Sequence, residues 1–111
     1  MSTVTTHVLD TARGAPAAGV PVRLESVSGA DQEEIGRAST DADGRVREIG
    51  PDRLPPGIYR LVFDTTAYFA QQRTAGFFPE VAITFTIDGD GPHYHVPLLL
   101  SPFGYATYRG S

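Results

Sequence analysis

The chain has 111 residues, a formal net charge of −4 at pH 7 and no cysteine, and 41% of its residues are hydrophobic while 20% are charged. This length predicts a single domain over residues 1–111. The composition is typical of a globular protein. The acidic balance argues against a nucleic-acid partner, and the lack of cysteine excludes disulfides and thiolate metal sites.

Membrane and export signals are missing from the pattern. No apolar run approaches the roughly 20 residues that a membrane-spanning helix needs. Residues 1–6 show neither the basic segment nor the apolar segment of a signal peptide. We therefore expect no membrane association and a cytoplasmic location.

Short strands separated by turns are predicted along most of the chain. Apolar and polar residues alternate with a period of two, as in half-buried strands, over three segments: 20–24, 59–63 and 81–87. Glycine, proline and aspartate mark turns at 13–14, 43–44, 55–57 and 88–92. Regular short strands with this punctuation predict an antiparallel β-sandwich.

Two segments add detail to this pattern. Proline cannot donate to a sheet ladder, so Pro21 places its strand at a sheet edge, or else lies at the strand's start or at a bulge. Residues 64–73 contain alanines and glutamines that favour helix, and Asp64 or Thr65 could cap it. One short helix is therefore expected after a central strand.

His7 is the first residue along the chain whose side chain could take part in a reaction. Residues two apart in a strand share a face, so His7 lies with Thr5 and Leu9 and points away from Val4 and Val8. On residue type alone, a surface or interface histidine with one hydrogen bond is the commoner interpretation, and catalysis is the rarer one.

The run 93–100 has two faces. Every second residue from Tyr94 to Leu100 is apolar, and this face is predicted to join the core. His93 and His95 share the other face, at an outer surface or an interface, and His93 is expected to be exposed beside the 88–92 turn. The histidine pair could hold zinc, but no acidic or cysteine ligand at matching spacing completes the set, so no metal site is predicted.

Three further polar residues remain ambiguous from the residues alone. Arg45 and Arg109 are either solvated surface charges or clamps for carbonyl groups and anions. Ser111 is either a frayed terminal residue or a hydroxyl held against a histidine. The chain has no Gly-rich phosphate loop, HExxH or GxSxG motif that would indicate another enzyme class.

Three motifs, considered together, resemble those of the transthyretin-related 5-hydroxyisourate hydrolases. They are residues 6–11 (Thr-His-Val-Leu-Asp-Thr), residues 43–45 (Asp-Gly-Arg) and the C-terminal run 93–111, which ends in Tyr-Arg-Gly-Ser. The resemblance extends over essentially the whole chain in order. Ala106 is one departure, at a position where serine is common in the family.

The resemblance implies a fold, an assembly and a reaction. The fold would be two four-stranded antiparallel sheets packed as a sandwich, with one short helix. The assembly would be a homotetramer, a dimer of dimers with active sites at the interface between dimers. The reaction would be hydrolysis of 5-hydroxyisourate to 2-oxo-4-hydroxy-4-carboxy-5-ureidoimidazoline, with no metal or organic cofactor.

The resemblance also implies roles for particular residues. His7, Arg45, His95 and Ser111 would be catalytic. The residues that bind substrate would be His7, Arg45, Tyr108, Arg109 and Gly110. Histidine can exchange protons near neutral pH, and arginine can hold the carbonyl groups of a flat heterocycle and stabilise a developing oxyanion.

Two other functions remain as alternatives. Transthyretin itself shares the family fold and carries thyroid hormones in the same channel, so the fold alone does not decide between catalysis and transport. The carrier lacks the two histidines and the Tyr-Arg-Gly-Ser ending that this chain has. A structural or carbohydrate-recognising sandwich is the third option, and it would leave that ending unexplained.

Overall fold

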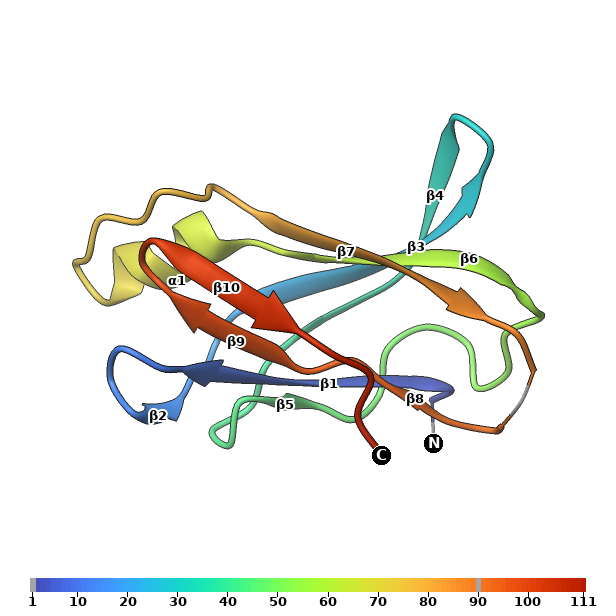
Figure 1. Cartoon of the computed structure of the whole chain (residues 1–111), viewed down its shortest axis with the longest axis horizontal. Coiled ribbons are helices and arrows are strands. Elements are labelled where there is room, and N and C mark those ends of the chain that lie inside the picture. The colour runs from blue at the N-terminus through green and yellow to red at the C-terminus, as the bar shows by residue number, and fades with distance from the viewer. Residues whose placement is uncertain (1, 90) are drawn as a thin grey trace.

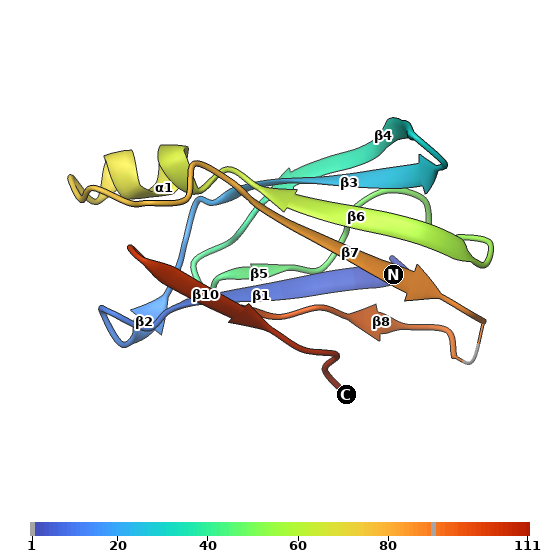
Figure 2. The ribbon, with the colours of Figure 1, turned by 45° about the horizontal axis from the view of Figure 1, so that its top comes forward.

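The structure, a computed structural model, describes residues 2–89 and 91–111. Met1 in the predicted N-terminal segment and Asp90 in the predicted 88–92 turn lie outside the described residues. Two β-sheets pack face to face, and one short helix lies at one end of the sandwich (Figures 1 and 2). The predicted transthyretin-like sandwich is therefore confirmed.

One sheet has four antiparallel strands, in the order β4-β3-β6-β7. Their bounds are Asp31–Ser39 for β4, Pro21–Ser28 for β3, Gly57–Phe63 for β6 and Val81–Ile87 for β7. Pro21 is the first residue of β3, which is an inner strand between β4 and β6. The proline therefore lies at a strand start, where a missing N–H costs no central ladder bond.

The second sheet is built around β1, Val4–Asp10. One edge of β1 pairs in parallel with β8 and β9, which span Tyr94–His95 and Leu98–Ser101. The other edge pairs antiparallel with β2 and β5, which span Ala15–Pro16 and Arg45–Val46. With β10, Gly104–Thr107, on the far side of β9, this sheet counts six strands but is four strands wide.

The parallel pairing departs from the purely antiparallel sheets that the sequence predicts. Strand β1 lies near the start of the described chain, and β8 and β9 lie near its end, so no hairpin fixes their relative direction. The remaining pairings, including the β9–β10 hairpin, are antiparallel as expected.

The core lies between the two sheets and contains the alternating residues that the sequence places there. From the second sheet it receives Val4 and Val8 of β1, together with Tyr94, Val96, Leu98 and Leu100, all at most 6% exposed. From the first sheet it receives Leu24, Leu61, Phe63 and Val81, all at most 1% exposed. The opposite face of β1 is therefore available for polar residues.

Helix α1, Thr65–Gln71, agrees with the predicted segment but is shorter. Asp64 is its N-cap, because its carboxylate accepts a hydrogen bond from the N–H of Ala67 at 2.9 Å. Within residues 2–89 and 91–111, no helix is long and apolar enough to cross a membrane.

A buried polar pair joins α1 to the end of β1. The Tyr68 hydroxyl donates to Oδ2 of Asp10 at 2.7 Å, and Asp10 is 2% exposed while Tyr68 is fully buried. Burial raises the pKa of Tyr68, and the bond to Asp10 raises it further, so the hydroxyl keeps its proton at neutral pH. This bond fixes the helix against the strand that carries the candidate site.

We predict that Tyr68→Phe lowers the free energy of unfolding by about 1–3 kcal/mol, because Asp10 then loses the buried donor that the structure gives it. Urea denaturation measures the change. Tyr59→Phe is the matched control and should cost less, since Tyr59 is 4% exposed but its hydroxyl donates to the backbone carbonyl of Pro55 and not to a buried carboxylate. Equal stability of the two variants would contradict this account of the pair.

Candidate active site

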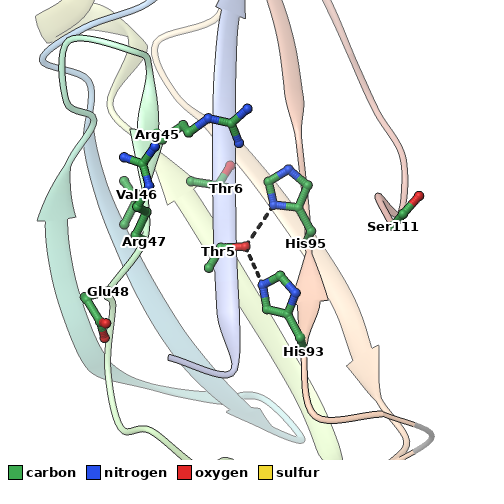
Figure 3. A pocket seen from close by; sticks show the side chains of 9 residues that line it. All are labelled: Thr5, Thr6, Arg45, Val46, Arg47, Glu48, His93, His95 and Ser111. Atoms are coloured by element: carbon green, nitrogen blue, oxygen red, sulfur yellow. Dashed lines mark hydrogen bonds between the residues drawn. The ribbon is translucent and has the colours of Figure 1, made fainter. Parts of the chain in front are cut away.

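An open cavity of about 380 Å³ lies beside the outer face of β1. Its lining comes from three parts of the chain that are distant in sequence: β1, the segment that contains β5, and the C-terminal segment around β8 (Figure 3). The lining residues are Thr5, Thr6, Arg45, Val46, Arg47, Glu48, His93, His95 and Ser111. Three of the four residues that the sequence suggested as catalytic, Arg45, His95 and Ser111, therefore lie around one cavity.

Strand pairing brings the two sides of the cavity together. Thr5 of β1 pairs with His95 of β8, and His7 of β1 pairs with Arg45 of β5. Since Thr5 and His7 share a face of β1, the side chains on both flanking strands lie on that same face. The predicted orientation of His7 and His95 away from the core is confirmed.

Thr5 is bonded to both histidines of the C-terminal segment. Its Oγ1 atom lies 2.8 Å from Nε2 of His93 and 2.8 Å from Nδ1 of His95, and Figure 3 shows the hydroxyl between the two rings. Thr5 is only 9% exposed, whereas His93 is exposed, as predicted, and His95 is half-buried. The ring of His95 is thus held at Nδ1, which leaves its Nε2 atom for other partners.

The turn 41–45 places Arg45 at the start of β5. Oδ1 of Asp41 accepts hydrogen bonds from the N–H groups of Asp43 and Arg45, both at 2.9 Å. Gly44 has φ of +76°, and a Cβ atom there would lie 2.4 Å from the carbonyl oxygen of Val8. Glycine is therefore required both for the turn and for its close approach to β1.

The same turn holds His7. Nε2 of His7 lies 2.9 Å from the carbonyl oxygen of Asp43, and because a carbonyl can only accept, this nitrogen carries a hydrogen. Neutral His7 consequently has its lone pair at Nδ1. His7 does not line the cavity itself, but it acts electrostatically on His95.

The environment of His95 disfavours its charged form. Burial lowers the pKa of His95 below the ordinary 6.5, and the nearby positive charges of Arg45, His93 and His7 lower it further. A hydrogen bond with the backbone of Thr5 acts in the opposite direction. His95 is therefore a neutral imidazole at neutral pH, able to accept a proton.

The last four residues, 108–111, contribute to two different cavities. The N–H of Gly110 donates to the carbonyl of His95 at 2.8 Å, and a Cβ atom at Gly110 would lie 2.6 Å from Cδ2 of the His95 ring. Glycine thus lets the tail pass directly over this ring and brings Ser111 to the cavity. Tyr108 and Arg109 lie elsewhere: they line a separate cavity of about 320 Å³, where the Arg109 guanidinium lies 4.5 Å from the ring centroid of Tyr94.

Six lining residues were not among the site residues predicted from the sequence: Thr5, Thr6, Val46, Arg47, Glu48 and His93. Thr5 lies on the same face of β1 as His7, and this spacing of two residues was the one signal in the sequence that placed Thr5 near the site. Its contact with the two histidines depends on pairing between residues about ninety positions apart, for which no local pattern exists. In the part of the chain that the structure describes, no three His, Cys, Asp or Glu side chains converge in a group that could hold a metal ion.

Fold and cavity together define a transthyretin-like sandwich with a histidine and arginine cavity on one sheet. The chain belongs to the HIUase/Transthyretin family, whose profile matches residues 4–110. The 5-hydroxyisourate hydrolase of Mus musculus is 44% identical over 113 residues, which cover 99% of this chain and 96% of the mouse protein.

Two solved structures represent two kinds of relative. The 5-hydroxyisourate hydrolase of Klebsiella pneumoniae has a TM-score of 0.87 and 41% identity, with 99% of this chain and 100% of that chain covered. Sea bream transthyretin in complex with thyroxine has a TM-score of 0.91 and 31% identity, with 97% and 94% covered. The fold is shared by both, but the sequence is closer to the hydrolases, and this chain is a hydrolase of the family.

We predict that His95 gains its proton only below pH 6.5, because burial and the positive neighbours oppose its charged form. Arg45→Met should move the midpoint of His95 to higher pH, since it removes a positive neighbour without adding a new charge. A pH titration followed by NMR of the imidazole rings measures both midpoints. A His95 midpoint above 6.5, or one unmoved in Arg45→Met, would show that this electrostatic description is wrong.

Proposed function

We propose that this protein hydrolyses 5-hydroxyisourate to 2-oxo-4-hydroxy-4-carboxy-5-ureidoimidazoline, a step of urate degradation. The observation that carries the proposal is the cavity lined by the neutral imidazole of His95 and the guanidinium of Arg45, which come from strands β8 and β5 on opposite edges of β1. Relatives named 5-hydroxyisourate hydrolase match this chain over nearly its full length.

In the proposed reaction His95 is the general base. Nε2 of His95 takes a proton from a water molecule, and the resulting hydroxide attacks a ring amide carbon of the substrate. The carbon–nitrogen bond then breaks and the leaving nitrogen receives a proton. A base with a lowered pKa suits this role because it is unprotonated at neutral pH.

Arg45 is the proposed electrophilic group. Its guanidinium presents several donors in one plane, which matches the carbonyl oxygens of a flat heterocycle. Donation to the attacked carbonyl stabilises the negative charge that develops as the amide carbon becomes tetrahedral. Figure 3 shows the Arg45 side chain extending from β5 over β1, in the direction of His95.

The other suggested residues take supporting roles in this proposal. His7 binds the substrate and exchanges a proton through Nδ1, since its Nε2 is bonded to Asp43. Ser111 orients the attacking water or His95, to which the Gly110 contact brings it close. Tyr108 and Arg109 face away from His95 within one chain, so their proposed contact with substrate requires a second subunit.

Transport of a small ligand, the activity suggested by the transthyretin likeness, is the weaker alternative. A carrier needs shape and apolar contact, whereas this cavity gathers two imidazoles, two guanidiniums, a carboxylate and hydroxyls. Such a set is costly to desolvate for binding alone and suits a reaction that moves protons.

We predict that Arg45→Ala and His95→Ala each reduce the turnover of 5-hydroxyisourate by about 10²–10³-fold, because each removes a group that acts in the transition state. His7→Ala should also lose most activity. The substrate is made in situ by urate oxidase, and its ultraviolet absorbance is followed. Arg37→Ala, an exposed arginine on the edge strand β4, is the control and should retain wild-type turnover.

An inactive wild-type protein in this assay would refute the proposed substrate. Near wild-type turnover by His95→Ala would instead keep the substrate and remove His95 as the base. Near-ultraviolet circular dichroism of each variant separates loss of chemistry from loss of fold.

We further propose that the protein is a homotetramer. Strands β7 and β10 are edge strands of their sheets, so each has an unpaired edge that can pair with another chain. Four large aromatic side chains are strongly exposed, namely Phe77, Phe103, Tyr105 and Tyr108, with exposed fractions of 44–74%. Burying them between subunits would remove this apolar surface from water.

Light scattering coupled to gel filtration is expected to give the mass of four 11.9 kDa chains. Phe103→Asp should shift the distribution toward smaller species, because burying a carboxylate at an apolar contact is costly. A wild-type monomer with full turnover would contradict a site that needs more than one subunit.

A further inference from the structure

Thr5 lies between the exposed His93 and the half-buried His95 and bonds to both. We propose that Thr5 is a positioning residue that links the two imidazoles into a proton relay, so that the charge of a proton taken up by His95 passes to His93. This inference rests on the proposed function of His95 as the general base. It assigns roles to two residues, Thr5 and His93, that the proposed reaction does not otherwise use.

A threonine hydroxyl has one hydrogen to donate and lone pairs with which to accept. When both imidazoles are neutral, Thr5 can donate to only one of the two nitrogens it faces, and the other nitrogen must donate to Thr5. The two 2.8 Å contacts therefore allow two arrangements of the same three groups, which differ in the positions of the protons.

In the first arrangement, Nδ1–H of His95 donates to Thr5, and the Thr5 hydroxyl donates to Nε2 of His93. His95 then has its lone pair at Nε2, the atom that the proposed reaction needs as a base. His93 is neutral and carries its hydrogen at Nδ1. This arrangement is the resting state of the relay.

The second arrangement follows when Nε2 of His95 takes a proton from water. The Nδ1–H bond of His95 breaks and its proton moves to Oγ1 of Thr5, while the hydroxyl proton of Thr5 moves to Nε2 of His93. Thr5 is again a neutral hydroxyl, now donating to Nδ1 of His95. His95 ends as a neutral imidazole with a hydrogen at Nε2, and His93 ends as the cation.

Electrostatics favours this displacement of charge. Arg45 on β5 and His7 on β1 both oppose a positive charge on His95. Arg47 and Glu48 are the other charged residues that line the cavity. His93 is exposed, so water can solvate its charge. The two rings lie 6.3 Å apart between centroids, with an angle of 27° between their planes, so one hydroxyl spans them without a further group.

The relay has a consequence for the second half of the reaction. His95 now carries its hydrogen at Nε2, where it can protonate the leaving nitrogen, and reversal of the relay returns the proton from His93. One imidazole thus acts as base and then acid without remaining charged beside Arg45.

The first test uses nitrogen NMR of the histidine rings and needs no substrate. In wild type at neutral pH, His95 should be in the tautomer with hydrogen at Nδ1, and on acidification His95 should not be the first ring of the pair to gain a proton. In Thr5→Val, which keeps the shape but lacks the hydroxyl, His95 should populate the Nε2–H tautomer. A wild-type His95 with its hydrogen at Nε2, or a first proton on His95, would overturn the relay.

The second test uses turnover of 5-hydroxyisourate. Thr5→Val should lower kcat by about ten- to a hundredfold and leave KM nearly unchanged, whereas Thr5→Ser should retain most of the kcat. Thr3→Val is the matched control, because Thr3 is equally buried and its hydroxyl donates to the carbonyl of Asp52 instead of to a histidine. Full kcat in Thr5→Val would overturn the proposal.

The third test separates a relay from simple support. His93→Ala should lose kcat in dilute buffer and recover it when imidazole is added, because a small base can accept the proton that His93 would have taken. Loss without recovery would mean that His93 only supports the structure, and the relay would be wrong. If wild type does not turn over 5-hydroxyisourate at all, the proposed function fails, while the tautomer measurement still decides the linkage.

Discussion

Strand β1 separates two environments, and every part of the candidate site depends on that separation. Its inner face carries Val4 and Val8, which are fully buried between the sheets, so the register of the strand is fixed by the core. A shift by one residue would exchange this face with the one that carries Thr5 and His7 and would bury a histidine among aliphatic side chains. The apolar core therefore decides which residues reach the cavity, although none of its side chains is chemically active.

The two edges of β1 then bring distant segments to one place. The parallel edge brings the C-terminal segment, and with it His95 and Ser111, while the antiparallel edge brings the turn 41–45 and Arg45. Each segment is fixed by backbone bonds as well as by side chains, since the N–H of Gly110 donates to His95 and that of Val8 donates to Gly44. Groups held on paired strands in this way are placed more precisely than groups on loops, as proton transfer requires.

Local patterns were sufficient for the half-buried strands and for α1, because alternation and an N-cap at Asp64 are local signals. Strand β4 was not predicted, since Asp31–Ser39 has mostly exposed side chains on both faces and no alternation to detect. The direction of β8 and β9 relative to β1 could not be predicted either. The site was predicted in part, because histidine and arginine are residue types with evident chemistry. The role suggested for Thr5 depends on a pairing between distant residues, which no local pattern indicates. The separation of Arg109 from His95 depends on the alternation of faces along the C-terminal segment.

In the proposed reaction, the cavity beside β1 binds the heterocycle between Arg45 and His95. A crystal structure with a non-hydrolysable, planar urate analogue tests it most directly. We expect density in the cavity of about 380 Å³, with carbonyl oxygens within hydrogen-bond distance of the Arg45 guanidinium and the ring beside Nε2 of His95. An analogue bound only in the cavity lined by Tyr108 and Arg109, out of reach of His95, would contradict it.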